Sequence, residues 1–260
     1  MSKGIDIKPA REAARISSFV RKVVKGASAK GVVVGLSGGI DSAVAGAVCV
    51  RALGKNRVLA LLLPSDHTPG VDLSDARRIA DSWGVRTVQI PISDIAELIT
   101  SSAGVKGTRI AKANVEARVR MILLYYFANS LGYLVAGTGD RSETTVGFYT
   151  KYGDGGVDFL PIAHLFKTQV RLLGAYLGLP RSVVEKPASP QLWPGHKASD
   201  ELPADYDKLD IVLHELFDLK AARKASATKA GVSASVPERV MQMHRKSAHK
   251  RALPPSLPPA

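Results

Sequence analysis

Short apolar runs alternate with longer amphipathic stretches along most of this chain. A short apolar run between turn residues is typical of a buried strand, and apolar residues at helical spacing are typical of a helix packed on a core. The pattern predicts strands at residues 31–36, 57–64, 85–90 and 133–137. It predicts helices at residues 9–25, 41–53, 73–83, 108–131, 167–177, 206–218 and 237–249.

This alternation of strands and helices favours an α/β fold. We expect a doubly wound, mostly parallel sheet with helices on both faces, followed by further helices at the C-terminal end. Glycine and proline clusters mark two long connections, at residues 152–161 and 187–203. The second is too long for an ordinary connection in a compact domain, so we interpret it as a lid or a binding loop. We expect one domain over residues 1–250 and an extended, Pro-rich tail over 251–260.

The composition is that of a protein with a large core and no disulfides. With 260 residues, of which 45% are hydrophobic, the chain can bury a sizeable interior. Its one cysteine, Cys49, lies among apolar residues of a predicted helix, and we expect a small buried side chain rather than a nucleophile. The first residues lack the apolar centre of a signal peptide, and the longest strongly apolar run, 58–63, is too short to cross a bilayer. We therefore expect a cytoplasmic protein that does not bind membranes.

The net charge of +13 raises nucleic acid as a partner. The basic residues are scattered over the predicted helices, however, apart from clusters at residues 220–229 and 244–251. A small molecule that carries several phosphates would account for local positive potential. We therefore do not expect nucleic acid to be a partner.

A glycine-rich loop follows the first predicted strand and precedes a predicted helix. It reads GLSGGIDS and comprises Gly35, Leu36, Ser37, Gly38, Gly39, Ile40, Asp41 and Ser42. Glycines let backbone N–H groups approach phosphate oxygens, and the positive end of the following helix favours negative charge. A tight turn capped by Ser37 or Ser42 would also use glycine, but the string SGGxDS is more specific than such a turn requires. The loop predicts an ATP site.

The loop lacks the lysine that a Walker loop places against the terminal phosphates. An acid, Asp41, stands where that cation would be expected. A carboxylate beside a triphosphate makes physical sense only when a hard cation bridges them. We therefore predict that Asp41 is a ligand of Mg2+.

Further sequence blocks follow the loop. Residues 137–156 read GTGDRSETTVGFYTKYGDGG. Smaller blocks lie at residues 157–158, 161–162, 166–170, 186–189, 192–195 and 247–251. The loop alone resembles that of the N-type ATP pyrophosphatases, and all the blocks together resemble the ammonia-dependent NAD+ synthetase family from about residue 8 to about residue 255.

The resemblance implies a fold, a reaction and a set of partners. The fold would be Rossmann-like, as in the adenine-nucleotide alpha-hydrolases. The nicotinic acid carboxylate of deamido-NAD+ would attack the α-phosphorus of ATP, pyrophosphate would leave, and ammonia would attack the adenylate to give NAD+ and AMP. ATP would be the co-substrate and Mg2+ the cofactor, because negative charge grows on the phosphates during the first step.

The resemblance also assigns roles to residues. Asp41, Glu143 and Lys167 would be catalytic, and Asp41 and Glu143 would hold Mg2+. ATP would contact the loop Gly35 to Ser42 together with Thr138, Lys167 and Ser189. Deamido-NAD+ would contact Arg118, Lys151, Asp158, His249 and Lys250. Without the resemblance, Glu143 could simply serve the first turn of a helix, and the basic residues could be ordinary surface charges.

The long predicted helix at residues 108–131 points to a dimer. Its segment 121–127 reads MILLYYF and is apolar all round. Because the core can cover only one face, a subunit interface is the simplest second cover, and the resemblance implies a homodimer with the dinucleotide bound across that interface. Burial of the whole helix within one domain is the alternative.

Two other functions stay open at this point. A tRNA-modifying enzyme would be expected to add a basic RNA-binding domain or cysteines for sulfur chemistry, and a non-catalytic nucleotide-binding module need not keep Glu143, Lys151 and Asp158. We expect free ammonia as the nitrogen source, because glutamine requires a nucleophilic cysteine with a base and Cys49 has apolar neighbours. A separate glutaminase partner also stays open.

Overall fold

The computed structural model describes residues 5–189, 193 and 195–257, so the predicted lid at 187–203 lies partly outside the described residues. Within them, four parallel strands form one sheet in the order β3-β2-β1-β4. These strands are β1 (Gly31–Gly35), β2 (Val58–Leu62), β3 (Arg86–Gln89) and β4 (Tyr133–Ala136).

The strand order determines where a ligand can bind. The chain passes from β1 outward to β2 and β3, and then returns to place β4 on the other side of β1. Open parallel sheets bind ligands beyond the carboxyl ends of their strands, at the point where the order reverses. Here that point lies between β1 and β4. The predicted α/β fold with a parallel sheet is confirmed.

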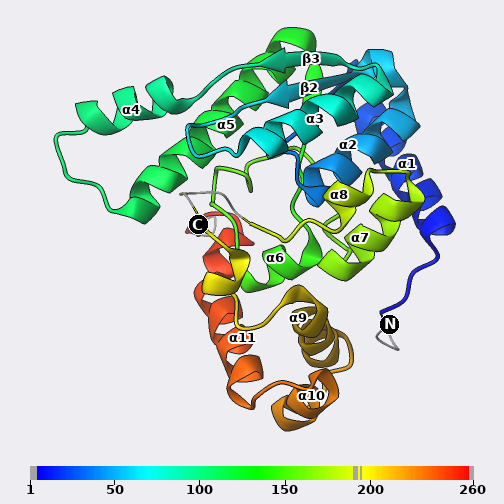
Figure 1. Ribbon diagram of the computed structural model, residues 1–260, viewed down its shortest axis with the longest axis vertical. Helices are drawn as coiled ribbons and strands as arrows, with labels where there is room; N and C mark the ends of the chain where they lie inside the picture. Colours follow the sequence, from blue (N-terminus) through cyan, green and yellow to red (C-terminus); the bar gives the residue numbers. More distant parts are fainter. Residues whose placement is uncertain (1–4, 190–192, 194, 258–260) are drawn as a thin grey trace.

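Helices cover both faces of this sheet (Figure 1). One face carries α1 (Pro9–Gly26), α2 (Ile40–Leu53), α3 (Gly70–Trp83) and α7 (Lys167–Tyr176). The other face carries α4 (Ser93–Ser102) and α5 (Arg109–Leu131). Successive side chains of a strand point to opposite faces. Val32 and Val34 therefore belong to the core with α1 and α2, and Val33 to the core with α5.

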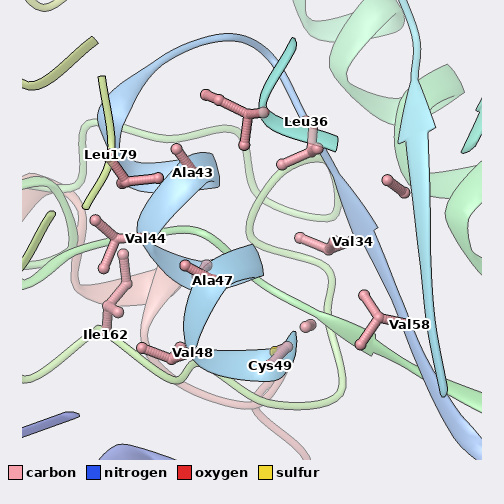
Figure 2. Packing of buried hydrophobic residues seen from close by; sticks show 14 of the residues in the cluster. Val34, Leu36, Ala43, Val44, Ala47, Val48, Cys49, Val58, Ile162 and Leu179 are labelled. Atoms are coloured by element: carbon pink, nitrogen blue, oxygen red, sulfur yellow. The ribbon is translucent and has the colours of Figure 1, made fainter. Parts of the chain in front are cut away.

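The core between the sheet and α2 is made of small and medium-sized apolar side chains. Figure 2 shows Val34 and Val58 of the sheet, with Val48 and Cys49 of α2 beside them. Cys49 is completely buried, which confirms the prediction of a small buried side chain. Burial raises the pKa of its thiol to about 12, so the reactive thiolate is scarce at neutral pH.

The C-terminal helices form a separate group with its own core, at the bottom of Figure 1. The helices are α6 (Arg141–Val146), α9 (Tyr206–Leu213), α10 (Arg223–Ala230) and α11 (Ser235–Lys246), whereas α8 (Arg181–Val184) packs on α7 in the core of the sheet domain. Of these, α9, α10 and α11 pack together, and α9 also contacts α6 and α7. A π-helical turn, His214–Asp218, continues α9. The contacts of α9 connect this group to the sheet domain.

Several predicted boundaries differ from the structure. The predicted helix at 206–218 ends in the π-helical turn, and the one at 237–249 ends at Lys246 before a 3-10 turn, Ala248–Lys250. The pattern missed α4, α6, α8 and α10. The missed helix α10 buries only Ser226, Ala227 and Ala230, whose small side chains produce no apolar period. None of the helices in the described ranges combines the length and the apolar character that a membrane span requires.

Candidate functional site

A cavity of about 480 Å3 lies at the carboxyl ends of β1, β2 and β4. Its lining comes from segments far apart in the sequence. These are residues 35–42 except Gly38, parts of 61–73 and 110–124, 136–138, 143, 147–157 in part, 167, 186–189, 193, 198, 201, 206 and 250. The cavity therefore lies at the edge of the sheet where the strand order predicts a ligand.

The glycine-rich loop forms one wall of this cavity. The side chain of Ser42 holds the two ends of this loop together. Its Oγ donates to the carbonyl of Gly39 at 3.0 Å and accepts from the N–H of Ser37 at 3.1 Å. Gly38 has φ of +80° and packs behind the loop, where an added Cβ would lie 2.1 Å from the carbonyl oxygen of Asp72. Only glycine fits there.

Lys167 joins the two sides of the site. It is the first residue of α7, and it is 1% exposed. Its Nζ lies 2.6 Å from Asp41 Oδ2 at the start of α2 and 2.8 Å from Glu143 Oε1 on α6. It also lies 3.1 Å from the buried Asp140. The residues that follow β1 and β4 therefore converge on one ammonium group.

Burial and charge act in opposite directions on this cluster. Burial lowers the pKa of Lys167, but the charges of Asp140, Asp41 and Glu143 outweigh burial and hold that pKa well above its usual value. Burial raises the pKa of Asp140 and of Glu143, and Lys167 opposes that rise. The mutual dependence of these groups makes the cluster sensitive to the loss of any one of them.

Asp140 is a residue of the site that the sequence analysis did not assign. Its Oδ1 accepts from the N–H of Glu143 at 2.8 Å, so it caps α6, and it holds Lys167 with the other oxygen. An acid three residues before a glutamate reads as an ordinary helix cap. No separate pattern in the sequence indicates its contact with Lys167.

Comparison with known proteins gives the family. The family model described as NAD synthase matches residues 12–254 of the chain. The chain belongs to the NAD synthase family. An NH(3)-dependent NAD(+) synthetase of Hyperthermus butylicus is 49% identical over 94% of this chain and 89% of its own length.

Two solved structures are similar to this chain over nearly its whole length. The structure of NMN synthetase from Francisella tularensis has a TM-score of 0.86 and 33% identity, and covers 98% of this chain and 99% of its own. The NH3-dependent NAD synthetase from Campylobacter jejuni has a TM-score of 0.83 and 28% identity, and covers 97% of this chain and 100% of its own. The predicted activity, ATP-dependent amidation of deamido-NAD+ with ammonia by a ligase, is thereby confirmed.

The predicted ATP contacts from other segments also line the cavity. Thr138 follows β4, and Ser189 lies on the segment after α8. The Oγ of Ser189 donates to the carbonyl of His196. Both residues thus line the same cavity as the glycine-rich loop.

The predicted dinucleotide contacts are divided between two places. Lys250 lines the cavity, and its Nζ donates to the carbonyls of Gly147 at 2.7 Å and Tyr149 at 2.5 Å. Arg118 and Lys151 lie outside the cavity lining but next to each other, because Arg118 donates to the carbonyl of Lys151 at 3.3 Å.

Asp158 and His249 also lie outside the lining. Asp158 accepts from the N–H of Val135 at 2.7 Å and from the hydroxyl of Tyr125 at 3.1 Å. His249 is exposed on the turn after α11.

Other lining residues were not assigned from the sequence. Asp154 accepts from the N–H of Thr150 at 2.7 Å, and burial raises the pKa of its carboxyl group. Lys186 donates to the carbonyl of Gly38 at 3.1 Å and to Asp72 and Asp75 at 2.6 Å each. Lys186 therefore links the segment that carries Ser189 to the glycine-rich loop and to α3.

The oxygen atoms of this site suit a hard divalent cation. Asp41 Oδ1 is buried without a hydrogen-bond partner in the described part of the chain. Among the described residues, no three His, Cys, Asp or Glu side chains are grouped as a metal site. Mg2+ commonly uses one or two carboxylates together with water and substrate phosphates, so Asp41 and Glu143 fit it without a third acid.

Proposed function

We propose that the cavity binds ATP with Mg2+ and that its residues promote adenylation of deamido-NAD+ as follows. The observation that supports this most is the convergence of Asp41 and Glu143 on Lys167 beside the glycine-rich loop. The reaction increases the negative charge on the phosphates of ATP. A buried ammonium group and two carboxylates that can hold Mg2+ are the groups that stabilise such charge.

The carboxylate of deamido-NAD+ attacks the α-phosphorus of ATP, and pyrophosphate leaves with two electrons of the broken P–O bond. The N–H groups at the start of α2 face the negative charge that grows on the phosphates. Lys167 adds a positive charge beside them, and Asp140 holds that ammonium group from behind. Asp41 and Glu143 would hold Mg2+, which neutralises phosphate charge when it is bound. Ammonia then attacks the acyl carbon, AMP leaves with the electron pair of the broken C–O bond, and the nitrogen loses one proton to give the neutral amide.

We also propose that two copies of the chain associate through α4 and α5. Along α5, Ile122 is 55% exposed and Tyr126 is 66% exposed, whereas Tyr125 and Phe127 are partly buried against the core. Further exposed apolar residues lie nearby in sequence, at Leu98, Ile99, Val105 and Ile110. A second copy of the same surface would cover these side chains.

The position of the dinucleotide contacts supports the same proposal. Arg118, Ile122 and Tyr126 are spaced four residues apart, so they lie on one side of α5. Arg118 is therefore on the side of α5 that carries the exposed apolar residues, outside the cavity of its own chain. A dinucleotide that starts in the cavity and reaches Arg118 would pass along the proposed interface.

Two further predictions from the sequence concern the location of the protein and its division into domains. A cytoplasmic location stays a prediction. The division into one domain over residues 1–250 and a tail over 251–260 is a proposal, supported by the contacts of α9 with both α6 and α7.

The direct test is product formation by the purified chain. With deamido-NAD+, ATP, Mg2+ and ammonium chloride, we expect NAD+, AMP and pyrophosphate in equal amounts. Because one similar structure is named NMN synthetase, the assay should also offer nicotinate mononucleotide in place of the dinucleotide. Preference for the mononucleotide, or no AMP from either substrate, would contradict the proposal.

A further inference from the structure

A fully buried carboxylate on α9 connects the two helices that carry Glu143 and Lys167. Asp210 is 0% exposed and does not line the cavity. Its Oδ1 accepts from Ser142 Oγ on α6 at 2.5 Å. Its Oδ2 accepts from the N–H and from the Oγ1 of Thr168 on α7, each at 2.8 Å. One side chain of the C-terminal group thus holds both helices.

These contacts give hydrogen-bond acceptors to the first backbone N–H groups of α7. The first N–H groups of a helix have no partner within the helix and favour negative charge. Phe166 precedes α7 and offers no polar side chain to cap it. The N–H of Lys167 instead donates to Ser142 Oγ at 2.9 Å, and the next N–H, of Thr168, donates to Asp210. Asp210 therefore acts as a cap supplied from a distant segment.

The same contacts set the distance between two residues of the site. Ser142 immediately precedes Glu143, and Thr168 immediately follows Lys167. A carboxylate that binds Ser142 with one oxygen and Thr168 with the other fixes the start of α6 against the start of α7. The meeting of Glu143 and Lys167 at 2.8 Å depends on that separation.

We propose that Asp210 is a positioning residue for the ATP site, and that it acts through Ser142 and Thr168. The proposal rests on the proposed roles of Glu143 and Lys167. It makes the C-terminal helices necessary for binding ATP with Mg2+, although Asp210 does not line the cavity.

Two variants and one control test the proposal. Ser142→Ala removes the link from Asp210 to α6, together with the partner of the Lys167 N–H, and leaves the contacts of Asp210 with Thr168. Asp210→Asn keeps the shape and removes the charge. Ser226→Ala is the matched control, because Ser226 is also fully buried and its Oγ donates to the carbonyl of Val212 on α9, away from α6 and α7.

We expect both variants to raise the Kd for ATP with Mg2+ by roughly tenfold in calorimetry, since small displacements of aligned groups have effects of this size or larger. The Mg2+ concentration for half-maximal rate should rise as well, while the KM for deamido-NAD+ stays close to that of the unchanged protein. Ser226→Ala should leave the ATP affinity unchanged even if it lowers the Tm.

Two results would overturn the proposal. In one, Ser142→Ala and Asp210→Asn bind ATP with Mg2+ as tightly as the unchanged protein. In the other, affinities for ATP and deamido-NAD+ fall together and follow the Tm in all three variants, which is the behaviour of a general structural residue. If the unchanged protein forms no NAD+, the proposed function fails, but the calorimetric comparison still decides the role of Asp210.

Discussion

At the scale of single residues, the site depends on charges that are buried together. Lys167 has three carboxylate partners, and each belongs to a different part of the local structure: Asp41 to α2, Asp140 to the cap of α6 and Glu143 to its first turn. Removing Asp41 still leaves two acids paired with Lys167, whereas removing Lys167 leaves three acids without their shared cation. Substitutions here should therefore affect function in distinguishable ways.

The first prediction concerns Asp41→Asn. We expect kcat to fall at least about a hundredfold at saturating Mg2+, the scale of losing one electrostatic contact to the transition state. The Tm should change little, because Asp140 and Glu143 still pair with Lys167. Steady-state kinetics and a thermal melt measure the two effects. Asp207→Asn, at a largely exposed acid, is the control and should keep full activity, and near-normal turnover of Asp41→Asn would remove Asp41 from the mechanism.

A second prediction concerns Cys49. Since burial raises the pKa of its thiol to about 12, the native protein should resist alkylation by iodoacetamide near neutral pH, as measured by mass spectrometry. Cys49→Ala should keep the full ammonia-dependent rate. Its stability should fall by about 1 kcal/mol, the size of a small cavity in a core. Glutamine-dependent activity that disappears in Cys49→Ala would contradict the inert role.

At the scale of elements, residues 141–146 are held from two sides of the C-terminal group. Asp210 binds Ser142, and the π-helical turn presents Asp218 to Arg141. His214 in the same turn lies 2.8 Å from Asp218. The turn therefore connects α6 to the end of α9 through the carboxylate of Asp218.

This connection predicts a pH dependence of stability. Burial alone would raise the pKa of Asp218, but hydrogen bonds from Arg141 and His214 lower it below its usual value of 3.8. A lowered pKa contributes stability that is present above the unfolded value and is lost as the pH falls through the folded value. The Tm of Asp218→Asn should therefore be lower than that of the unchanged protein near neutral pH.

The difference in Tm should shrink as the pH falls below 3.8. Differential scanning calorimetry over a series of pH values measures it. A difference that stays constant down to low pH would show that packing, and not charge, is what the substitution changes.

The elements also show what the sequence could predict. In buried strands and long helices, apolar residues recur at a regular spacing, and that spacing predicts these elements correctly. The short helix α6 reads RSETTV and is stabilised by Asp140 and by Asp210, which come from outside it. Six residues are too few to show an apolar period, so apart from the cap by Asp140 the helix depends on tertiary contacts.

In the candidate site too, some residues could be predicted from the sequence and others could not. Sequence motifs placed Asp41, Glu143 and Lys167 among the candidates, because they occur in blocks with a specific order. Asp210 stands in a helix whose other inward residues are apolar, and an acid there looks like a surface residue. Its role becomes visible only when α6 and α7 are seen beside it.

At the scale of the whole molecule, the surface of α4 and α5 predicts a dimer. We expect sedimentation to show a dimer at micromolar concentration. Tyr126→Asp should convert it to a monomer with weaker binding of deamido-NAD+, because a charge would be buried in an apolar interface. Tyr176→Asp, at an exposed tyrosine of α7 on the other face, is the control and should remain dimeric. A monodisperse, fully active monomer of the unchanged protein would contradict the interface.

The whole molecule is rich in basic residues, whereas the cluster around Lys167 is rich in acidic ones. The chain carries +13 overall, whereas the cluster around Lys167 holds three carboxylates against one ammonium group. At long range, polyanionic nucleotides are drawn toward the protein, most strongly at low salt. Close to Lys167, bare triphosphate meets three acidic side chains grouped around one ammonium group. The empty protein should thus discriminate between nucleotide that arrives with its metal and nucleotide that arrives alone, and excess chelator should slow capture of ATP before it slows any chemical step.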